Sequence, residues 1–374
     1  MLENLHLINF KAARNLDLPL APLTLLAGLN GSGKSSILQS LAAIRQSYQL
    51  GQSRGLQLRG PISHLGKGKD VLSEGAEEKI TLTMREDGVE FQWVCKVTLD
   101  TNLQEYTKWP PTSPKFALEP YFQYLQADRI VPLTMYPQAD EQVRQAKFLG
   151  THGEFTADFL ASNNSQTVSE KRLFPRDGVT LDNVLWTKIA PTSQLPDQVA
   201  GWLQQISPGA RLRVEPLAGT DEVMLQFQYV GQELGFEAGY YRPTNVGFGL
   251  TYSIPILVAC LAAPAGALLL IENPEAHLHP QGQAKLGELL AICAADGVQI
   301  IVETHSDHVL NGIRLAVKKG ALNANNVRLC YFTRNIASGD CNVELPSVLS
   351  DGQLSNWPEG FFDQWEKSLD ALLD

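Results

Sequence analysis

One glycine-rich stretch constrains the fold of this chain more than any other feature. Residues 28–35 read Gly-Leu-Asn-Gly-Ser-Gly-Lys-Ser and match G-x-x-x-x-G-K-[ST] at every fixed position. The stretch follows residues 23–27, an apolar run short enough for a buried strand. It precedes residues 35–47, whose apolar side chains recur at helical spacing. The order strand, glycine loop and helix predicts a phosphate-binding loop.

The residue types in this loop suit a nucleotide. Glycines let the backbone turn so that several N–H groups point at phosphate oxygens, and the helix adds its positive N-terminal end. Lys34 supplies a charge for the β and γ phosphates, and the Ser35 hydroxyl can bind Mg²⁺. We therefore expect ATP and Mg²⁺ as cofactors. The predicted nucleotide-binding residues are Gly28, Asn30, Gly31, Ser32, Gly33, Lys34, Ser35 and Ser36.

A second apolar run, residues 268–272, ends in the carboxylate of Glu272. At the carboxyl edge of a parallel sheet this group would face the loop and hold Mg²⁺ with Ser35, although it could also be a solvated charge. Asn273 follows directly, and Glu275 is the nearest carboxylate able to polarise an attacking water. With His277 and His279, Glu275 could also form a metal cluster, but a solvated loop or a dimer contact fits better.

Two further segments carry polar groups suited to the same site. Residues 300–307 read as a buried strand followed by Glu303, Thr304 and His305. His305 could sense a γ-phosphate, or it could be a structural histidine. Residues 244–249 open a helix, where the Asn245 amide and the backbone N–H at Gly247 could bind a phosphate. The predicted catalytic residues are Lys34, Glu272, Asn273, Glu275 and His305.

The pattern of elements predicts an α/β fold. Apolar strands at 267–271 and 298–302 alternate with helices at 249–263, 281–294 and 308–317. This alternation favours a parallel sheet covered on both faces. The middle of the chain lacks heptads, so no coiled-coil arms are expected. The predicted divisions are an N-terminal part at 1–106, a middle insertion at 107–235, a second ATPase part at 236–345 and a small element at 346–374.

Composition limits which partners the protein is expected to bind and where in the cell it is expected to lie. The net charge of −10 argues against sequence-independent coating of DNA. A local contact with DNA remains open through basic residues that could equally be a solvated loop, namely Arg45, Arg54, Arg59, Lys67 and Lys69. Five cysteines without a C-x-x-C pair indicate reduced thiols. The N-terminus lacks signal-peptide character and the longest apolar stretch is interrupted by prolines, so we expect a cytoplasmic protein without membrane contact.

With these motifs in order, the chain resembles ABC-type P-loop ATPases of the group that includes SMC proteins, RecF-like repair ATPases and the ATPase domain of OLD nucleases. Residues 272–280 and 303–306 are similar to the Walker B and switch-histidine segments of OLD-like ATPases, and residues 7–11 and 23–28 resemble the group's opening. Residues 352–363 look like a small C-terminal domain of unknown function from bacterial ATPases, often defence-associated.

The resemblance implies a two-lobed ATPase head that forms a homodimer, with ATP held between one phosphate loop and the partner's signature helix at 245–249. Asn273 stands where such ATPases carry a second acid, and His279 where an aspartate is common. Either Glu275 or another group replaces that acid, or hydrolysis is slow. The lid glutamine that joins the two lobes has no clear counterpart, and its candidates are Gln57 and residues 65–70.

The resemblance favours an ATP-hydrolysing, ATP-gated switch in nucleic-acid transactions, in antiphage defence or DNA repair. The stretch after Trp357 is short for an appended nuclease domain, so we expect a partner effector such as a nuclease. Asn273 keeps open a nucleotide-dependent scaffold with little turnover. A transporter subunit is disfavoured because the signature lacks the Ser-Gly-Gly-Gln form and residues 35–270 are a long separation.

Overall fold

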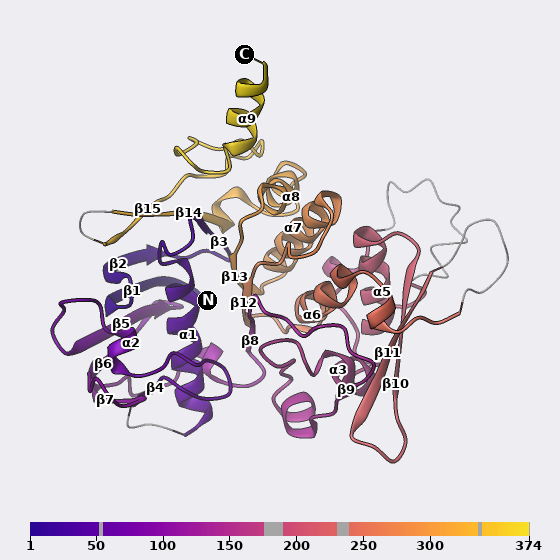
Figure 1. Ribbon diagram of the computed structural model, residues 1–374, viewed down its shortest axis with the longest axis horizontal. Helices are drawn as coiled ribbons and strands as arrows, with labels where there is room; N and C mark the ends of the chain where they lie inside the picture. Colours follow the sequence, from indigo (N-terminus) through magenta and orange to yellow (C-terminus); the bar gives the residue numbers. More distant parts are fainter. Residues whose placement is uncertain (52–54, 176–189, 230–238, 336–338, 374) are drawn as a thin grey trace.

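The computed structural model describes residues 1–51, 55–175, 190–229, 239–335 and 339–373. A parallel sheet runs through the middle of the molecule, with the N-terminal sheet and α1 on one side and α5 to α8 on the other (Figure 1). The predicted α/β class is therefore confirmed.

The central sheet has six strands. Five of them are parallel, and β15 is antiparallel at one edge. In spatial order they are β15 (Cys341–Glu344), β14 (Val327–Arg334), β3 (Leu23–Gly28), β13 (Gln299–Glu303), β12 (Leu268–Glu272) and β8 (Phe122–Leu125). The strand before the glycine loop and the strand ending in Glu272 thus lie on either side of β13. All three end at the same edge of the sheet.

Alternate side chains of the central strands enter two separate cores. Leu25, Ile271 and Val302 belong to one core, and Leu26, Leu270 and Ile301 to the other. Helices cover both faces, as the near-continuous apolar strands predict. The longer helices are α1 (Lys34–Gln49), α5 (Leu195–Ile206), α6 (Phe248–Ala262), α7 (Pro280–Ala295) and α8 (Asp307–Lys318).

A second, antiparallel sheet packs with α1 in the N-terminal part. Its central hairpin joins residues 79–86 to residues 89–96 and turns at Asp87 and Gly88, both of which have positive φ. In spatial order the strands are β2 (Ala13–Pro19), β1 (Leu2–Phe10), β5 (Lys79–Glu86), β6 (Val89–Lys96), β7 (Leu103–Lys108) and β4 (Gly55–Gln57). The short helix α2 (Gly68–Val71) lies beside this sheet.

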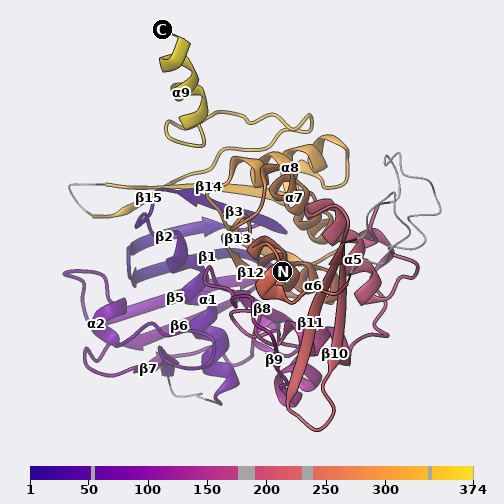
Figure 2. The ribbon, with the colours of Figure 1, turned by 45° about the vertical axis from the view of Figure 1, so that its right-hand side comes forward.

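The middle segment is only partly an insertion. Its strand β8 pairs in parallel with β12, so the division predicted at residue 107 separates in sequence what the central sheet joins in space. The rest includes α3 (Thr156–Ser162), α5 and a small sheet of β9 (Tyr136–Pro137), β10 (Ala210–Pro216) and β11 (Glu222–Tyr229). The long hairpin of β10 and β11 extends away from the centre (Figure 2). The boundary predicted between 235 and 236 lies outside the described residues.

The C-terminal residues pack on α8 before the chain turns outward. Arg314 of α8 donates to the carbonyl oxygen of Gly352 at 2.7 Å, and Phe361 packs against Tyr331 of β14. Helix α9 (Gln364–Leu373) then projects from the body (Figure 1). Within the described ranges, no helix has the length and apolar character that a membrane span requires. The remaining short helices are η1 (Lys115–Ala117), η2 (Glu141–Gln145), η3 (Glu170–Arg172), η4 (Pro243–Asn245) and η5 (Ala324–Asn326).

Candidate nucleotide-binding site

The glycine loop has the backbone shape that its sequence predicts. It leaves β3 at Gly28 and enters α1 at Lys34. Gly28 has φ 138°, and a Cβ there would lie 2.1 Å from the carbonyl oxygen of Phe332. Gly33, at the N-terminal cap of α1, has φ 105°. These two positions require glycine, because side chains disfavour such φ values and the first has no space.

Lys34 points into the loop rather than into solvent. Its side chain is 3% exposed, and Nζ donates to the carbonyl oxygens of Gly28 and Leu29 at 2.9 Å each. Burial lowers the pKa of Lys34, and the nearby carboxylate of Glu303 partly offsets this effect. The loop therefore holds a positive charge at its centre.

The other predicted loop residues divide by exposure. Asn30 and Gly31 are exposed at the rim, and Ser32 and Ser36 are buried. Ser35 is half-buried, and its hydroxyl donates to Oε1 of Glu303 at 3.2 Å. The predicted metal ligand Ser35 thus contacts the carboxylate at the end of β13, which the sequence analysis did not select.

Glu272 and Glu303 close neighbouring parallel strands and are aligned in register. The Glu272 carboxylate accepts from the Tyr124 hydroxyl at 2.5 Å and from the Ala127 backbone N–H at 3.1 Å. Burial raises the pKa of Glu272, and these two hydrogen bonds oppose the rise. Burial and the neighbouring Glu272 charge likewise raise the pKa of Glu303. The buried Glu303 therefore lies beside Lys34 at the edge of the sheet, and the half-buried Glu272 lies one strand farther away.

A buried arginine fixes the end of β12. Arg129 donates to the carbonyl oxygens of Glu272 at 2.7 Å and Asn273 at 2.6 Å, and its guanidinium lies 5.3 Å from the Tyr252 ring of α6. Burial lowers its pKa to about 10. Arg129 was not among the predicted site residues, although residues 124–129 resemble a stretch of the bacterial ATPases named above.

Asn273 and Glu275 have structural contacts of their own. Asn273 has a positive φ of 42°, and its N–H donates to the Glu303 carbonyl oxygen at 2.8 Å. The Glu275 carboxylate accepts from the Thr304 hydroxyl at 2.6 Å and the His305 N–H at 2.8 Å. Glu275 therefore holds the segment that carries the switch histidine. His305 itself is exposed, and partial burial together with Lys34 lowers its pKa.

Comparisons with known proteins agree with this arrangement. The family described as "AAA domain, putative AbiEii toxin, Type IV TA system" matches residues 157–311, and "Protein of unknown function (DUF3696)" matches residues 322–372. A curated relative, the OLD nuclease of Thermus scotoductus, is 46% identical over 41 residues, which are 11% of this chain and only 8% of the nuclease.

Two solved structures share the fold. An SMC head bound to the C-terminal winged-helix domain of ScpA has a TM-score of 0.53 and 14% identity, with 93% of this chain and 98% of that chain covered. An SMC head with an extended coiled coil, bound to the C-terminal domain of ScpA from Pyrococcus furiosus, has a TM-score of 0.51 and 13% identity over 100% and 99% of the two chains. The chain therefore has the fold of an SMC-type head, and part of its sequence is similar to an AAA-domain family and to a short stretch of an OLD nuclease. No coiled-coil arm occurs among the residues described for this head.

The signature residues lie at the exposed start of α6. Asn245 and Gly247 are exposed, and Phe248 is 50% exposed. Phe248 and Tyr252 pack against the ring of His277, with ring centroids 5.6 and 4.8 Å away. The predicted signature helix thus contacts the loop that follows β12. His279 caps α7 by accepting from the Gln281 N–H.

The structure bears on the predicted alternative metal cluster and on the candidate lid glutamine. No group of three or more His, Cys, Asp and Glu side chains suited to a metal ion occurs in the described part of the head. Gln57 lies in β4 of the antiparallel sheet. Gln126 instead follows β8 directly, and its amide donates to the Ile62 carbonyl oxygen at 3.0 Å. Gln126 therefore joins the end of the central sheet to the N-terminal part.

Fewer of the five basic residues predicted as possible DNA contacts are exposed than expected. Arg45 is buried and donates to the Ala117 carbonyl oxygen and to Glu119, so it is a structural residue and was wrongly included. Arg59, Lys67 and Lys69 are exposed, and Lys69 lies 3.8 Å from Asp100. Arg54 lies outside the described residues.

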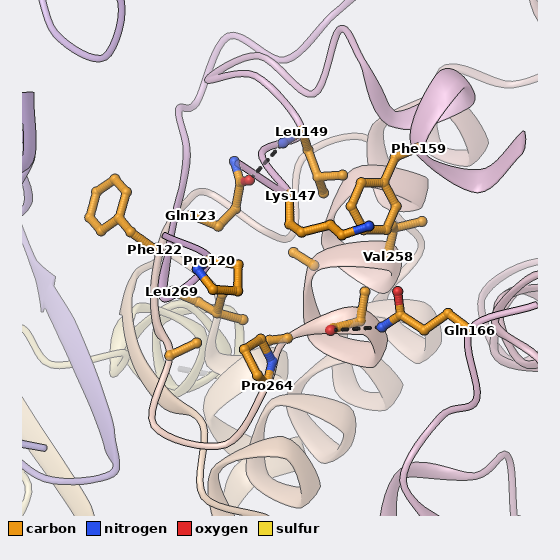
Figure 3. Close-up of a pocket in the computed structure, with 14 residues that line it drawn as sticks. Pro120, Phe122, Gln123, Lys147, Leu149, Phe159, Gln166, Val258, Pro264 and Leu269 are labelled. Atoms are coloured by element: carbon orange, nitrogen blue, oxygen red, sulfur yellow. Dashed lines mark hydrogen bonds between the residues drawn. The ribbon is translucent and has the colours of Figure 1, made fainter. Parts of the chain in front are cut away.

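An apolar cavity of about 250 Å³ lies away from the loop, on the α6 side of β8 and β12 (Figure 3). Phe122, Leu149, Phe159 and Leu269 contribute to its wall. The one charged side chain in that wall, Lys147, donates from Nζ to Asn163. A triphosphate has no suitable partner there, so the glycine loop remains the candidate nucleotide site.

Proposed function

We propose that this head binds ATP with Mg²⁺ and hydrolyses it, and that ATP-driven pairing of two copies acts as a switch in nucleic-acid transactions. The observation that carries the proposal is the buried Lys34 inside the glycine loop, beside the buried strand-end carboxylate of Glu303. Nothing in an ordinary strand-to-helix turn requires this costly arrangement of buried charges.

The loop supplies the groups that bind and orient a triphosphate. Its backbone N–H groups and the N-terminus of α1 attract phosphate oxygens, and Lys34 adds a full positive charge. The donor set fits Mg²⁺, which prefers hydroxyl and carboxylate oxygens and keeps part of its water shell. Ser35 and a strand-end carboxylate, for which the sequence predicts Glu272, would hold it. When bound, the ion would neutralise charge that develops on the phosphates.

The described site lacks an obvious group that would orient and deprotonate the attacking water. Asn273 cannot accept a proton as the usual second acid does, and both oxygens of Glu275 are already hydrogen-bonded. His305 is exposed at the same edge of the sheet and could contact a γ-phosphate. We therefore expect slow hydrolysis, as suits a switch. A scaffold with little turnover is the second candidate function, and Asn273 is the residue that favours it.

Pairing of two heads is supported by the exposed start of α6. Asn245 and Gly247 present polar groups to solvent, and Phe248 presents an apolar ring. In a homodimer these groups would contact the nucleotide held in the partner's loop. Exposed aromatic side chains are common in interfaces, which agrees with this use of Phe248.

The biological role rests on the relatives. One matching family is described as a toxin of a toxin–antitoxin system, and one relative is a nuclease. We propose a cytoplasmic role in antiphage defence or DNA repair, with a partner effector such as a nuclease. Contact with DNA would involve Arg59, Lys67 and Lys69.

Two measurements test the proposal. ATP binding and phosphate release are compared for the natural protein, Lys34→Ala and the control Lys319→Ala. Lys34→Ala should weaken ATP binding and abolish phosphate release, whereas the exposed Lys319 should be dispensable; normal turnover in Lys34→Ala would reject the site. The proteins and nucleic acids that co-purify with the natural chain, with and without a non-hydrolysable ATP analogue, then test the role. A nuclease partner would support the switch, and recovery of a membrane protein would contradict it.

A further inference from the structure

Glu303 occupies a central position at the carboxyl edge of the parallel sheet. It is the last residue of β13, which lies between β3 and β12. It is aligned with Glu272 on one side and with Leu26, two residues before Gly28, on the other. The backbone thus places Glu303 nearer to the glycine loop than Glu272, by one strand.

The Glu303 side chain is buried and incompletely bonded. The residue is 7% exposed. Oε1 accepts from the Ser35 hydroxyl at 3.2 Å and lies 3.8 Å from Nζ of Lys34. Oε2 is fully buried and has no hydrogen-bond partner in the described part of the chain. A buried carboxylate oxygen without a partner is costly, and a cation is the partner that such an oxygen suits best.

Glu272 is bonded in a different way. One of its oxygens accepts from the Tyr124 hydroxyl and the other from the Ala127 N–H. Neither bond involves the loop. Of the two strand-end acids, Glu303 is therefore the one whose carboxylate contacts Ser35 and retains an unbonded oxygen.

A backbone hydrogen bond links Glu303 to the residue after Glu272. The Asn273 N–H donates to the Glu303 carbonyl oxygen at 2.8 Å, which holds the ends of β12 and β13 side by side.

We propose that Glu303 is a carboxylate ligand of Mg²⁺ beside Ser35, with Glu272 held by Tyr124 and Ala127 as the more distant acid. This inference rests on the proposed binding of ATP with Mg²⁺. It assigns the metal to the pair Ser35 and Glu303 instead of the pair Ser35 and Glu272.

Metal binding is measured directly, with Mn²⁺ as the probe and its electron paramagnetic resonance signal as the readout, in the presence of ADP. The variants are Glu303→Gln, Glu272→Gln and the control Glu344→Gln, which removes an exposed carboxylate at the far edge of the same sheet. Glu303→Gln should weaken Mn²⁺ binding at least about tenfold and more than Glu272→Gln does, because changes around a metal ion commonly cost that much or more. The control should bind Mn²⁺ as the natural protein does.

ATP affinity measured without metal distinguishes failure of the proposed ATP binding from failure of the Glu303 assignment. In EDTA, Glu303→Gln should bind ATP as well as or better than the natural protein, because a negative charge has been removed and the glutamine is isosteric. If the natural protein binds neither ATP nor ADP, the proposed function fails. If it binds both and Glu303→Gln keeps full Mn²⁺ affinity, the assignment of Glu303 is overturned and the proposed function stands. Loss of Mn²⁺ binding in Glu272→Gln alone would overturn it too.

Discussion

Nη1 of Arg129 donates to the main-chain carbonyl oxygen of Glu272 at 2.7 Å, across 143 positions of the sequence. Nη2 of the same guanidinium bonds the next carbonyl, that of Asn273, at 2.6 Å. A single side chain from the segment after β8 therefore fixes the two residues at which β12 ends. Because its guanidinium also lies near the Tyr252 ring, it links this strand end to the signature helix.

Replacing Arg129 should destabilise the head strongly. Arg129→Met leaves two buried carbonyl oxygens without their donor, which we expect to cost roughly 2–5 kcal/mol of unfolding free energy. Arg129→Lys should recover part of the loss, since a shorter side chain with a compact ammonium does not reproduce the planar fork of the guanidinium. Urea unfolding measures the effect, with the exposed Arg59→Met as control. A loss in Arg129→Met no larger than in the control would contradict this account.

Gly28 should tolerate no side chain. In Gly28→Ala the new Cβ would meet the Phe332 carbonyl oxygen at 2.1 Å, in addition to the strain of φ 138°. Gly75 is the matched control, because it has φ 70° with nothing within 4 Å of a Cβ. Gly75→Ala should cost about 1–2 kcal/mol from backbone strain alone. Gly28→Ala should lower the melting temperature further and weaken ATP binding; equal losses in the two variants would show that the close approach is unimportant.

Periodicity and motif predicted much of the fold, because the elements concerned carry strong local signals. The helices α1, α6, α7 and α8 and the strands β3, β12 and β13 were all confirmed within a few residues. The strand β8 was missed. It has only four residues, follows a proline-rich stretch and pairs with β12, which lies far along the chain. Only tertiary pairing identifies such a strand.

The site was predictable as a set of motifs but not as a set of contacts. The loop and Glu272 follow from sequence pattern, whereas the contact between Ser35 and Glu303 depends on which strands are neighbours. Arg45 shows the opposite error. It was counted as a surface charge, but the Ala117 carbonyl oxygen and Glu119 hold it inside the protein. The sequence carries no local sign of either contact.

Glu275 should act through the residues it positions. Glu275→Gln retains one acceptor oxygen for the two donors at Thr304 and His305, so the switch segment should shift and phosphate release should fall more than ATP affinity. A double-mutant cycle with Thr304→Val tests this route. The two substitutions should be strongly non-additive in turnover. Additive effects would mean that Glu275 acts independently, as a base for the attacking water would.

The stability of the metal-free protein should depend on the charge of Glu303. Burial and the Glu272 charge raise the pKa of Glu303 above its ordinary value, with a smaller effect of Glu275 in the same direction, whereas Lys34 and the Ser35 hydrogen bond oppose the rise. The folded state therefore holds the Glu303 proton more tightly than the unfolded state does. The stability that this group contributes is present below its ordinary pKa and is lost as pH rises through the raised value.

Glu303→Gln removes this loss, because glutamine stays neutral at every pH. In buffer with EDTA and without nucleotide, the variant should melt roughly 1–3 °C above the natural protein at pH 8. The difference should shrink as the pH falls through the raised pKa of Glu303, because the protonated carboxyl resembles the amide. Glu344→Gln, which removes an exposed carboxylate, should show no comparable dependence on pH. A Glu303→Gln variant that is less stable than the natural protein at pH 8 would mean that Lys34 and Ser35 outweigh the cost of burying this carboxylate.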